Sequence, residues 1–424
     1  MLTGNNGILQ RAVEAKKKTE EEQIIEEAQM DILSTQSSKL ADALSEVELE
    51  GILSPKYGTL STEEERTIDK KLTTTDGKYV IPVSKIYNGE LKVSLPIVTT
   101  PPITAVAQNT KYDDGDNIAV IPKGFRVSDN ENEQKIETGL VVFDNKDNEW
   151  VWIPVEDAHE MYDEIEETAL YGSTGVKTTK ISKSEIISGN TRGVPGVTWP
   201  SKWIEPELVG TDGDGDYAKT AGFKNSVDMA TNFVKDYNQM IKSVGKYGGF
   251  YVGRYEMTGS LENPTEKSGE VLTNKIWYEF YKACKAFSTP EVESRMIWGC
   301  QWDEVCLFIS RHGDKKDIND SRSWGNYKCS TGNAKITEKN GEKQITGYST
   351  YWSANKIYDI AGNCGEHTQE GQNNRFRATR GGYHFSNYML STYYYVSARC
   401  VDSHETYYGD NDVCTRPAIY IKAK

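Results

Sequence analysis

Two acidic side chains near the C-terminus have the spacing of a cation site. Asp359 and Glu366 bracket the sequence DIAGNCGE, whose glycines let main-chain carbonyls turn inward. Carboxylates and carbonyl oxygens are the hard ligands that Ca²⁺ prefers. The alternative is a loop tied by hydrogen bonds from backbone amides to the two carboxylates.

A second acidic run, DGDGD at 212–216, has the pattern of the first half of an EF-hand loop. Its sixth position is Tyr217 where that loop needs Gly, and its twelfth is Phe223 where it needs a bidentate Glu. We therefore expect a solvated turn here rather than a calcium loop.

The segment from Tyr383 to Cys414 has an unusual composition. Seven of the chain's 25 tyrosines fall in these 32 residues, whereas Lys, Glu, Gln, Met and Trp are represented only by Met389 and Glu405. When one or both adenines of an AAC codon are replaced by other bases, the resulting codons encode none of these five residue types. Tyrosine with short polar residues also suits a binding surface, because tyrosine gives large contacts at low entropic cost. An ordinary Tyr-rich loop is the alternative.

Within this segment we expect the aromatic and short polar side chains to be displayed and the aliphatic ones and arginines to be scaffold. The expected displayed residues are Tyr383, His384, Ser386, Asn387, Tyr388, Tyr393, Tyr395, Asp402, His404, Tyr407, Tyr408, Asp410 and Asn411. The expected scaffold residues are Leu390, Val396, Ala398, Arg399, Val401, Val413, Arg416 and Pro417.

The elements that position these residues differ between the two ends of the chain. Apolar residues at spacings of three, four and seven between Leu9 and Leu33 predict an amphipathic helix, or two with a break at 34–38. A solvated or coiled-coil helix is the simplest interpretation. Strand-like runs follow over 58–98, with turns at 76–77 and 88–89. The paired prolines of 99–104 predict a linker, and hence domains at 1–104 and 105–424.

The second domain alternates strands with a few helices, which predicts an α+β fold. The expected strands lie at 140–144, 149–155 and 248–257, and the expected helices at 226–244, 277–287 and 302–310.

Composition excludes several classes of function. The net charge of −14 argues against a nucleic-acid binder, which needs a basic face. No apolar run reaches the roughly 18 residues of a membrane-spanning helix. Seven cysteines without a CxxC pair or Cys/His spacing predict neither a disulfide framework nor a zinc site.

Three segments of the chain resemble parts of known protein families. Residues 1–23 resemble the part of Gram-positive pilin-like proteins that follows their membrane helix, which implies that an anchor helix is missing before Met1. From about Pro122 onward the ordered motifs GGFYVGRYEMT, NKIWYEFYKACK, WGCQWDEV, YDIAGNCGEHT, TRGGYHF and TRPAIYI resemble the formylglycine-generating-enzyme-like branch of the C-type lectin fold. The Tyr-rich segment resembles the variable region of diversity-generating retroelement proteins, which use this fold.

The lectin-fold resemblance implies specific roles for several residues. It implies a structural Ca²⁺ held by Asp359, Glu366 and the carbonyls of Gly362 and Cys364, although the family usually has Trp where Gly365 and His367 stand. Recurrent arginines of the family match Arg399 and Arg416, which are expected to lock the last strands by buried pairing. The two copper-binding cysteines of the enzymes fall on Ser386 and Ser391, and a hydroxyl cannot replace a thiolate for Cu(I). We therefore expect no catalysis and no redox cofactor.

Together these observations predict a non-enzymatic binding protein at the cell surface or on a pilus. Its ligand would be a protein or glycan on another cell, a phage or a host, and other pilin subunits are further candidate partners. The alternatives are a structural minor pilin without a diversified site and, less favoured, a copper- or iron-dependent oxidoreductase.

Overall fold

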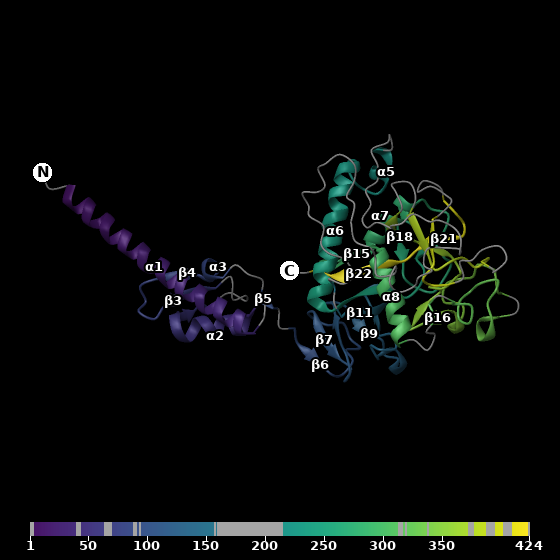
Figure 1. The fold of residues 1–424 in the computed structure, drawn as a ribbon, viewed down its shortest axis with the longest axis horizontal. Helices are drawn as coiled ribbons and strands as arrows, with labels where there is room; N and C mark the ends of the chain where they lie inside the picture. Colours follow the sequence, from purple (N-terminus) through teal and green to yellow (C-terminus); the bar gives the residue numbers. More distant parts are fainter. Residues whose placement is uncertain are drawn as a thin grey trace. The chain divides into compact units, whose positions relative to one another are not determined.

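The chain folds into two compact units, Met1–Leu95 and Pro96–Lys424, which are described separately (Figure 1). The computed structural model describes residues 4–39, 44–62, 70–87, 91–92, 95–156, 158, 215–312, 317–318, 320–336, 339–371, 377–386, 395–401 and 409–422. Within these ranges, no helix combines the length and the apolar character that crossing a membrane requires.

The first unit is built on the predicted N-terminal helix. Helix α1 (Gly4–Lys39) buries Ala28 and Ile32 against Leu49 and Leu53 of α2 (Glu46–Tyr57), which confirms the predicted helix. The predicted apolar stripe holds only in part, because Leu33 is 56 % exposed. The helix also continues through the serine-rich stretch where a break was considered. Ser45 begins α2 with a capping box, because its hydroxyl accepts from the Glu48 amide while the Glu48 carboxylate accepts from the Ser45 amide.

Short strands complete this unit. The antiparallel strands β2 (Gly58–Leu60), β3 (Lys71–Thr74) and β4 (Val80–Pro82) form one sheet, and the turn predicted at 76–77 joins the last two. The other elements are β1 (Leu44–Ser45), α3 (Val83–Ile86) and β5 (Leu91–Lys92). The turn expected at 88–89 lies outside the described residues.

The boundary between the units lies before Pro96, earlier than the expected position at 104/105. Strand β6 (Ile97–Val98) pairs with β7 (Thr110–Asp113), which pairs with β8 (Ile118–Ile121). The proline-containing stretch is therefore attached to the second unit, where the Pro102 carbonyl also accepts from the Val127 amide.

A six-stranded antiparallel sheet forms the centre of the second unit, in the order β15-β22-β12-β11-β10-β9. Strands β12 and β22 are buried along their whole length, so both faces of the sheet are covered. The strand bounds are β9 (Arg126–Val127), β10 (Val141–Phe143), β11 (Glu149–Pro154), β12 (Gly249–Gly253), β15 (Val292–Met296) and β22 (Pro417–Ile421).

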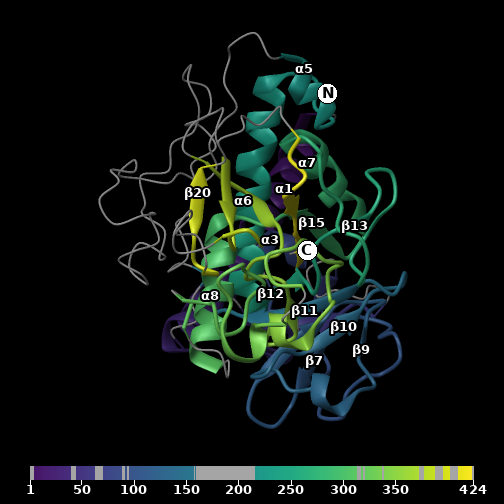
Figure 2. The same cartoon turned by 90° about the vertical axis from the view of Figure 1, so that its right-hand side faces the viewer.

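Three helices pack on this sheet at the positions that the sequence predicts. Helix α6 (Ser226–Tyr247) packs on β12 and β22, and α7 (Trp277–Cys284) with its 3-10 extension to Phe287 packs on β15. Helix α8 (Gly299–His312) contacts both β11 and the strand β18 of a second sheet. Figure 2 labels the three helices in a view turned by 90°. The α+β class is confirmed.

The second sheet has four strands in the order β20-β19-β18-β21, of which only the β18–β21 pair is parallel. Their bounds are β18 (Gly365–Gly371), β19 (Arg377–Arg380), β20 (Arg399–Val401) and β21 (Val413–Thr415). Because only Arg416 separates β21 from β22, the chain passes from the small sheet to the large sheet at that residue.

Smaller elements surround the two sheets. They are α5 (Gly215–Thr220), β13 (Thr258–Gly259), β14 (Pro264–Thr265), β16 (Ser353–Ala354), β17 (Ile357–Tyr358) and short 3-10 helices at 131–133, 332–334 and 350–352. The acidic run at 212–216 lies mostly outside the described residues, and its last two residues belong to α5.

Candidate functional site

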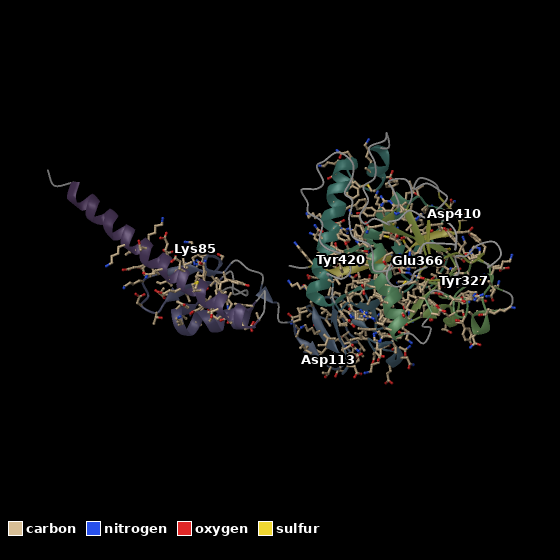
Figure 3. The ribbon with its side chains drawn as sticks, viewed as in Figure 1. Lys85, Asp113, Tyr327, Glu366, Asp410 and Tyr420 are labelled. Atoms are coloured by element: carbon tan, nitrogen blue, oxygen red, sulfur yellow. The ribbon has the colours of Figure 1, made fainter. Side chains whose placement is uncertain are left out.

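The two ends of the Tyr-rich segment meet on one loop, Asn363–Glu366. The His384 amide donates to the Asn363 carbonyl at 2.9 Å, and the Gly365 amide donates to the Asp412 carbonyl at 2.9 Å. The His384 ring lies 4.0 Å from the Asp412 carboxylate. The two ends of the segment are therefore attached to the framework at the same place, with Asp410 nearer the rim of the unit than the buried Glu366 (Figure 3).

Exposed side chains mark this place. Phe385 is 45 % exposed, stacks on Tyr383 with ring centroids 5.2 Å apart, and meets His384 edge-on. Asn411 is exposed as well, and its carbonyl accepts from Lys343 Nζ at 2.7 Å. An aromatic group and polar groups thus lie together at the two ends of the segment.

The prediction of displayed residues is correct at some positions and wrong at others. Asn411 is exposed, whereas Tyr383, His384 and Asp410 are half-buried. Ser386 is fully buried, because its amide and hydroxyl close a turn on Tyr383. The remaining expected residues, Asn387, Tyr388, Tyr393, Asp402, His404, Tyr407 and Tyr408, lie outside the described residues.

Tyr395 is also not displayed, being only 7 % exposed. It begins a stretch that returns to the core, where Val396 accepts from the Trp302 indole and donates its amide to Ser321 Oγ. The scaffold prediction holds for Val396, Ala398, Val413, Arg416 and Pro417, which are buried. Leu390 and the side chains of Arg399 and Val401 lie outside what the structure describes.

Phe385 is the exposed residue that the sequence analysis missed. A phenylalanine is ordinarily a core residue, so its type argued against display. Its position inside a run of tyrosine and short polar residues was the available signal. The structure adds it to the candidate binding surface.

The small residue at Gly365 makes room for the segment. A Cβ atom on Gly365 would lie 2.6 Å from the Tyr383 ring, so no larger side chain fits beneath that ring. The double glycine before the segment has a similar role. Gly381 and Gly382 both have left-handed backbones (φ 81° and 78°), and a Cβ on Gly381 would approach the Ile360 carbonyl within 2.8 Å.

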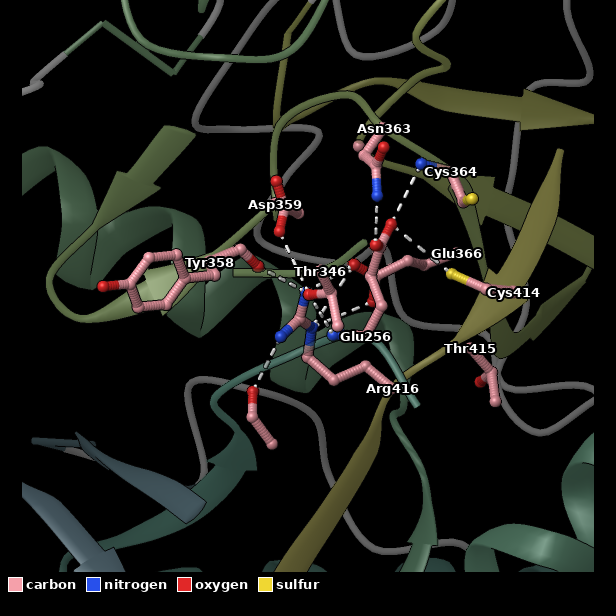
Figure 4. Close-up of polar contacts among 12 residues, drawn as sticks. Glu256, Thr346, Tyr358, Asp359, Asn363, Cys364, Glu366, Cys414, Thr415 and Arg416 are labelled. Atoms are coloured by element: carbon pink, nitrogen blue, oxygen red, sulfur yellow. Dashed lines mark hydrogen bonds and ion pairs between the residues drawn. The ribbon is translucent and has the colours of Figure 1, made fainter. Parts of the chain in front are cut away.

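Beneath this loop, Arg416 joins the two sheets, and the sequence prediction of a buried pairing is confirmed. Its guanidinium is fully buried and binds both carboxylate oxygens of Glu366, at 2.7 and 3.0 Å. It also donates to the carbonyls of Gly253 and Tyr358, each at 2.8 Å (Figure 4).

Four buried carboxyl groups act on this one guanidinium. Burial raises the pKa of Asp359 to about 7, and it raises the pKa of Glu256 and of Glu266 well above the usual range. Burial also raises the pKa of Glu366, and Arg416 opposes that rise. Of the four carboxyl groups, Glu366 is the one that binds the guanidinium directly, and this contact favours its ionised form.

The two carboxylates predicted to bind calcium, Asp359 and Glu366, have other partners in this arrangement. Asp359 Oδ2 accepts from the Thr346 hydroxyl and the Gly347 amide, as the alternative of a carboxylate-tied loop expects. Both Glu366 oxygens bind Arg416. Asp359 Oδ1 is buried without a hydrogen-bond partner. Calcium at Asp359, Gly362, Cys364 and Glu366 stays a prediction.

Cys364 and Cys414 come together with Glu256 at the same place. Their three possible ligand atoms all lie within 4.8 Å of one another, and all three residues are buried. No motif spacing indicates this cluster, since 158 residues separate Glu256 from Cys414. Of the two serines at the resembled copper positions, Ser386 closes the turn on Tyr383 and Ser391 lies outside the described residues.

Compared with known proteins, the chain matches no family model, and no curated protein is significantly similar to it.

Proposed function

We propose that this chain is a non-enzymatic ligand-binding protein whose segment 383–414 is a binding surface diversified by a retroelement. The carrying observation is that main-chain hydrogen bonds hold both ends of the segment on one loop. A backbone amide and a carbonyl keep these bonds whichever side chains stand at 384 and 412. The side chains of the segment are thereby freed to vary while its ends stay in place.

The framework under the loop supports the same proposal. The framework residues beneath the ends of the segment are buried and are held in place by polar contacts, above all the ion pair between Arg416 and Glu366. A rigid framework carrying a variable loop is the arrangement by which proteins present binding residues. Exposed Phe385, stacked on Tyr383, offers the large rigid contact that binding sites favour.

We infer a formylglycine-generating-enzyme-like C-type lectin fold for the second unit and a pilin-like role for the first, with display outside the cell or on a pilus. The ligand would be a protein or glycan on another cell, a phage or a host. A structural minor pilin is the second candidate, and the 36-residue helix α1 favours it.

The binding surface should tolerate substitution where the structure exposes it and resist it where the structure buries it. Asn411→Ala should change the free energy of unfolding by no more than about 0.5 kcal/mol, and Phe385→Ala, which loses a stacking contact, by no more than about 1.5 kcal/mol. Tyr395→Ala, the matched aromatic control in the core, should cost about 3 kcal/mol. Urea denaturation followed by fluorescence measures all three. Equal losses for Phe385→Ala and Tyr395→Ala would contradict the assignment of Phe385 to the surface.

Binding itself is tested with a library. The full chain is displayed on yeast with the expected displayed positions randomised, except Ser386 and Tyr395, and is selected against one defined folded protein. Binders with different segment sequences should be enriched, and they should lose binding when the segment is restored to the present sequence. A control library randomises as many exposed positions elsewhere in the second unit. Enrichment from the control library alone would overturn the proposal.

A further inference from the structure

Glu256, Cys364 and Cys414 form a buried cluster in the second unit. Glu256 follows β12, Cys364 precedes β18 and Cys414 lies in β21, so three elements distant in sequence each contribute one residue. All three side chains are buried. Two thiols and a carboxylate facing one another in a core form a donor set that apolar packing does not require.

The spacing of the cluster fits a tetrahedral metal ion. The Glu256 Oε1 atom lies 3.7 Å from Cys414 Sγ. A zinc ion about 2.3 Å from sulfur and about 2.1 Å from oxygen sets these two ligands about 3.6 Å apart at the tetrahedral angle. All three donor atoms lie within 4.8 Å of one another, close enough for one ion to touch each of them.

Neighbouring groups already orient the carboxylate. Glu256 Oε1 accepts from the Cys364 amide at 2.9 Å, and Oε2 accepts from Asn363 Nδ2 at 2.6 Å (Figure 4). Asn363 is itself held, because its Oδ1 accepts from Asn326 Nδ2 and from the Gln344 amide. Outer hydrogen bonds of this kind fix the ligands of metal sites and raise their affinity.

We propose that Glu256, Cys364 and Cys414 bind one zinc ion. Binding replaces the two thiol protons and the proton that burial keeps on the Glu256 carboxyl group, and all three leave to solvent, so that two thiolates and one carboxylate coordinate the ion. Three protein ligands leave a fourth coordination position. This zinc site does not depend on the proposed binding function. Its ion would connect the loop Asn363–Glu366, through Cys364, to strand β21, through Cys414.

A disulfide is the competing use of the same two cysteines. It would require the sulfurs to approach to about 2.05 Å. It would also remove the thiol hydrogen that Cys414 directs at Glu256, leaving a buried carboxylate oxygen with one donor fewer. The metal site uses all three side chains, whereas the disulfide uses two, so the geometry favours the metal.

The test uses the full chain, expressed with zinc in the medium and freed of loose metal by gel filtration. Elemental analysis should find about one zinc per chain. Cys364→Ser and Cys414→Ser should lose it, whereas Cys284→Ser, a cysteine equally buried but outside the cluster, should keep it. Glu256→Gln should weaken zinc affinity by at least the roughly 10- to 100-fold that loss of a supporting residue costs, because it alters a direct ligand; competition with a chromogenic chelator measures this.

A second measurement covers the case in which a cysteine variant does not fold. Cobalt is exchanged into the unaltered chain, where two thiolates should give the charge-transfer absorption of Co²⁺–sulfur bonds. Alkylation of Cys364 and Cys414, read by peptide mass spectrometry, should become faster once a chelator removes the ion. A zinc-free chain with no cobalt–sulfur band, a Cys364–Cys414 disulfide, or zinc retained by both serine variants would overturn the proposal.

Discussion

Arg416→Met should lower the free energy of unfolding by about 3–5 kcal/mol, the cost of breaking a buried ion pair by removing one partner. The guanidinium is fully buried between the two sheets and donates to Glu366 and to two backbone carbonyls. Its loss leaves the Glu366 carboxylate buried without its cation. Burial then favours the protonated form of that carboxyl group, at a cost in stability.

Urea denaturation of the full chain measures this loss, with the transition of the second unit followed by tryptophan fluorescence. Arg126→Met is the matched control, because its pair with Asp147 is partly exposed (33 % for Arg126 and 66 % for Asp147) and should contribute no more than about 1 kcal/mol. The double variant Arg416→Met/Glu366→Gln should recover part of the loss, since it removes the unpaired charge. Equal stability of Arg416→Met and Arg126→Met would show that Arg416 does not lock the sheets.

Arg380→Met should have an effect of similar size, about 3–5 kcal/mol, for a different part of the framework. Arg380 and Asp303 are both buried, with Nη2 2.9 Å from Oδ1, and Arg380 Nε donates to the Ala398 carbonyl at 2.9 Å. The residue thus connects strand β19 and helix α8 to the stretch where the Tyr-rich segment returns to the core.

The same unfolding experiment measures Arg380→Met, with Arg311→Met as its control because the Arg311–Glu156 pair is exposed. Removing Asp303 as well, in Arg380→Met/Asp303→Asn, should restore part of the stability. Hydrogen exchange adds a local readout, since the Ala398 amide should lose protection before the amides of β12. Unchanged protection at Ala398 together with unchanged stability would contradict this role.

Periodic and strongly patterned elements could be predicted from the sequence. The spacing of apolar residues indicated α1, and the apolar and aromatic runs in EWVWIP and GGFYVG indicated β11 and β12, which are buried on both faces. The domain boundary was placed too late. The prolines at 101 and 102 mark a stretch without regular structure, yet Pro102 makes a main-chain hydrogen bond to the second unit.

Contacts between residues far apart in the chain could not be predicted in this way. Ser386 and Tyr395 were expected on the surface because of their residue types. Ser386 is instead buried in a turn on Tyr383, and Tyr395 is buried where the chain re-enters the core. Nothing local connects Glu256 with Cys414, because the chain folds them together only through the sheets. The pairing of Arg416 was expected, whereas its partner Glu366 was assigned to a calcium site.

The central claim is that segment 383–414 varies between cells while its framework does not. The most direct measurement is to sequence the DNA encoding Gly381–Lys424, with its flanks, from many cells of the source population. We expect substitutions confined to adenines of a nearby near-repeat, sparing the codons of Val413 and Arg416, beside a reverse-transcriptase gene. An invariant segment without a repeat would contradict the account and leave the structural pilin as the better explanation.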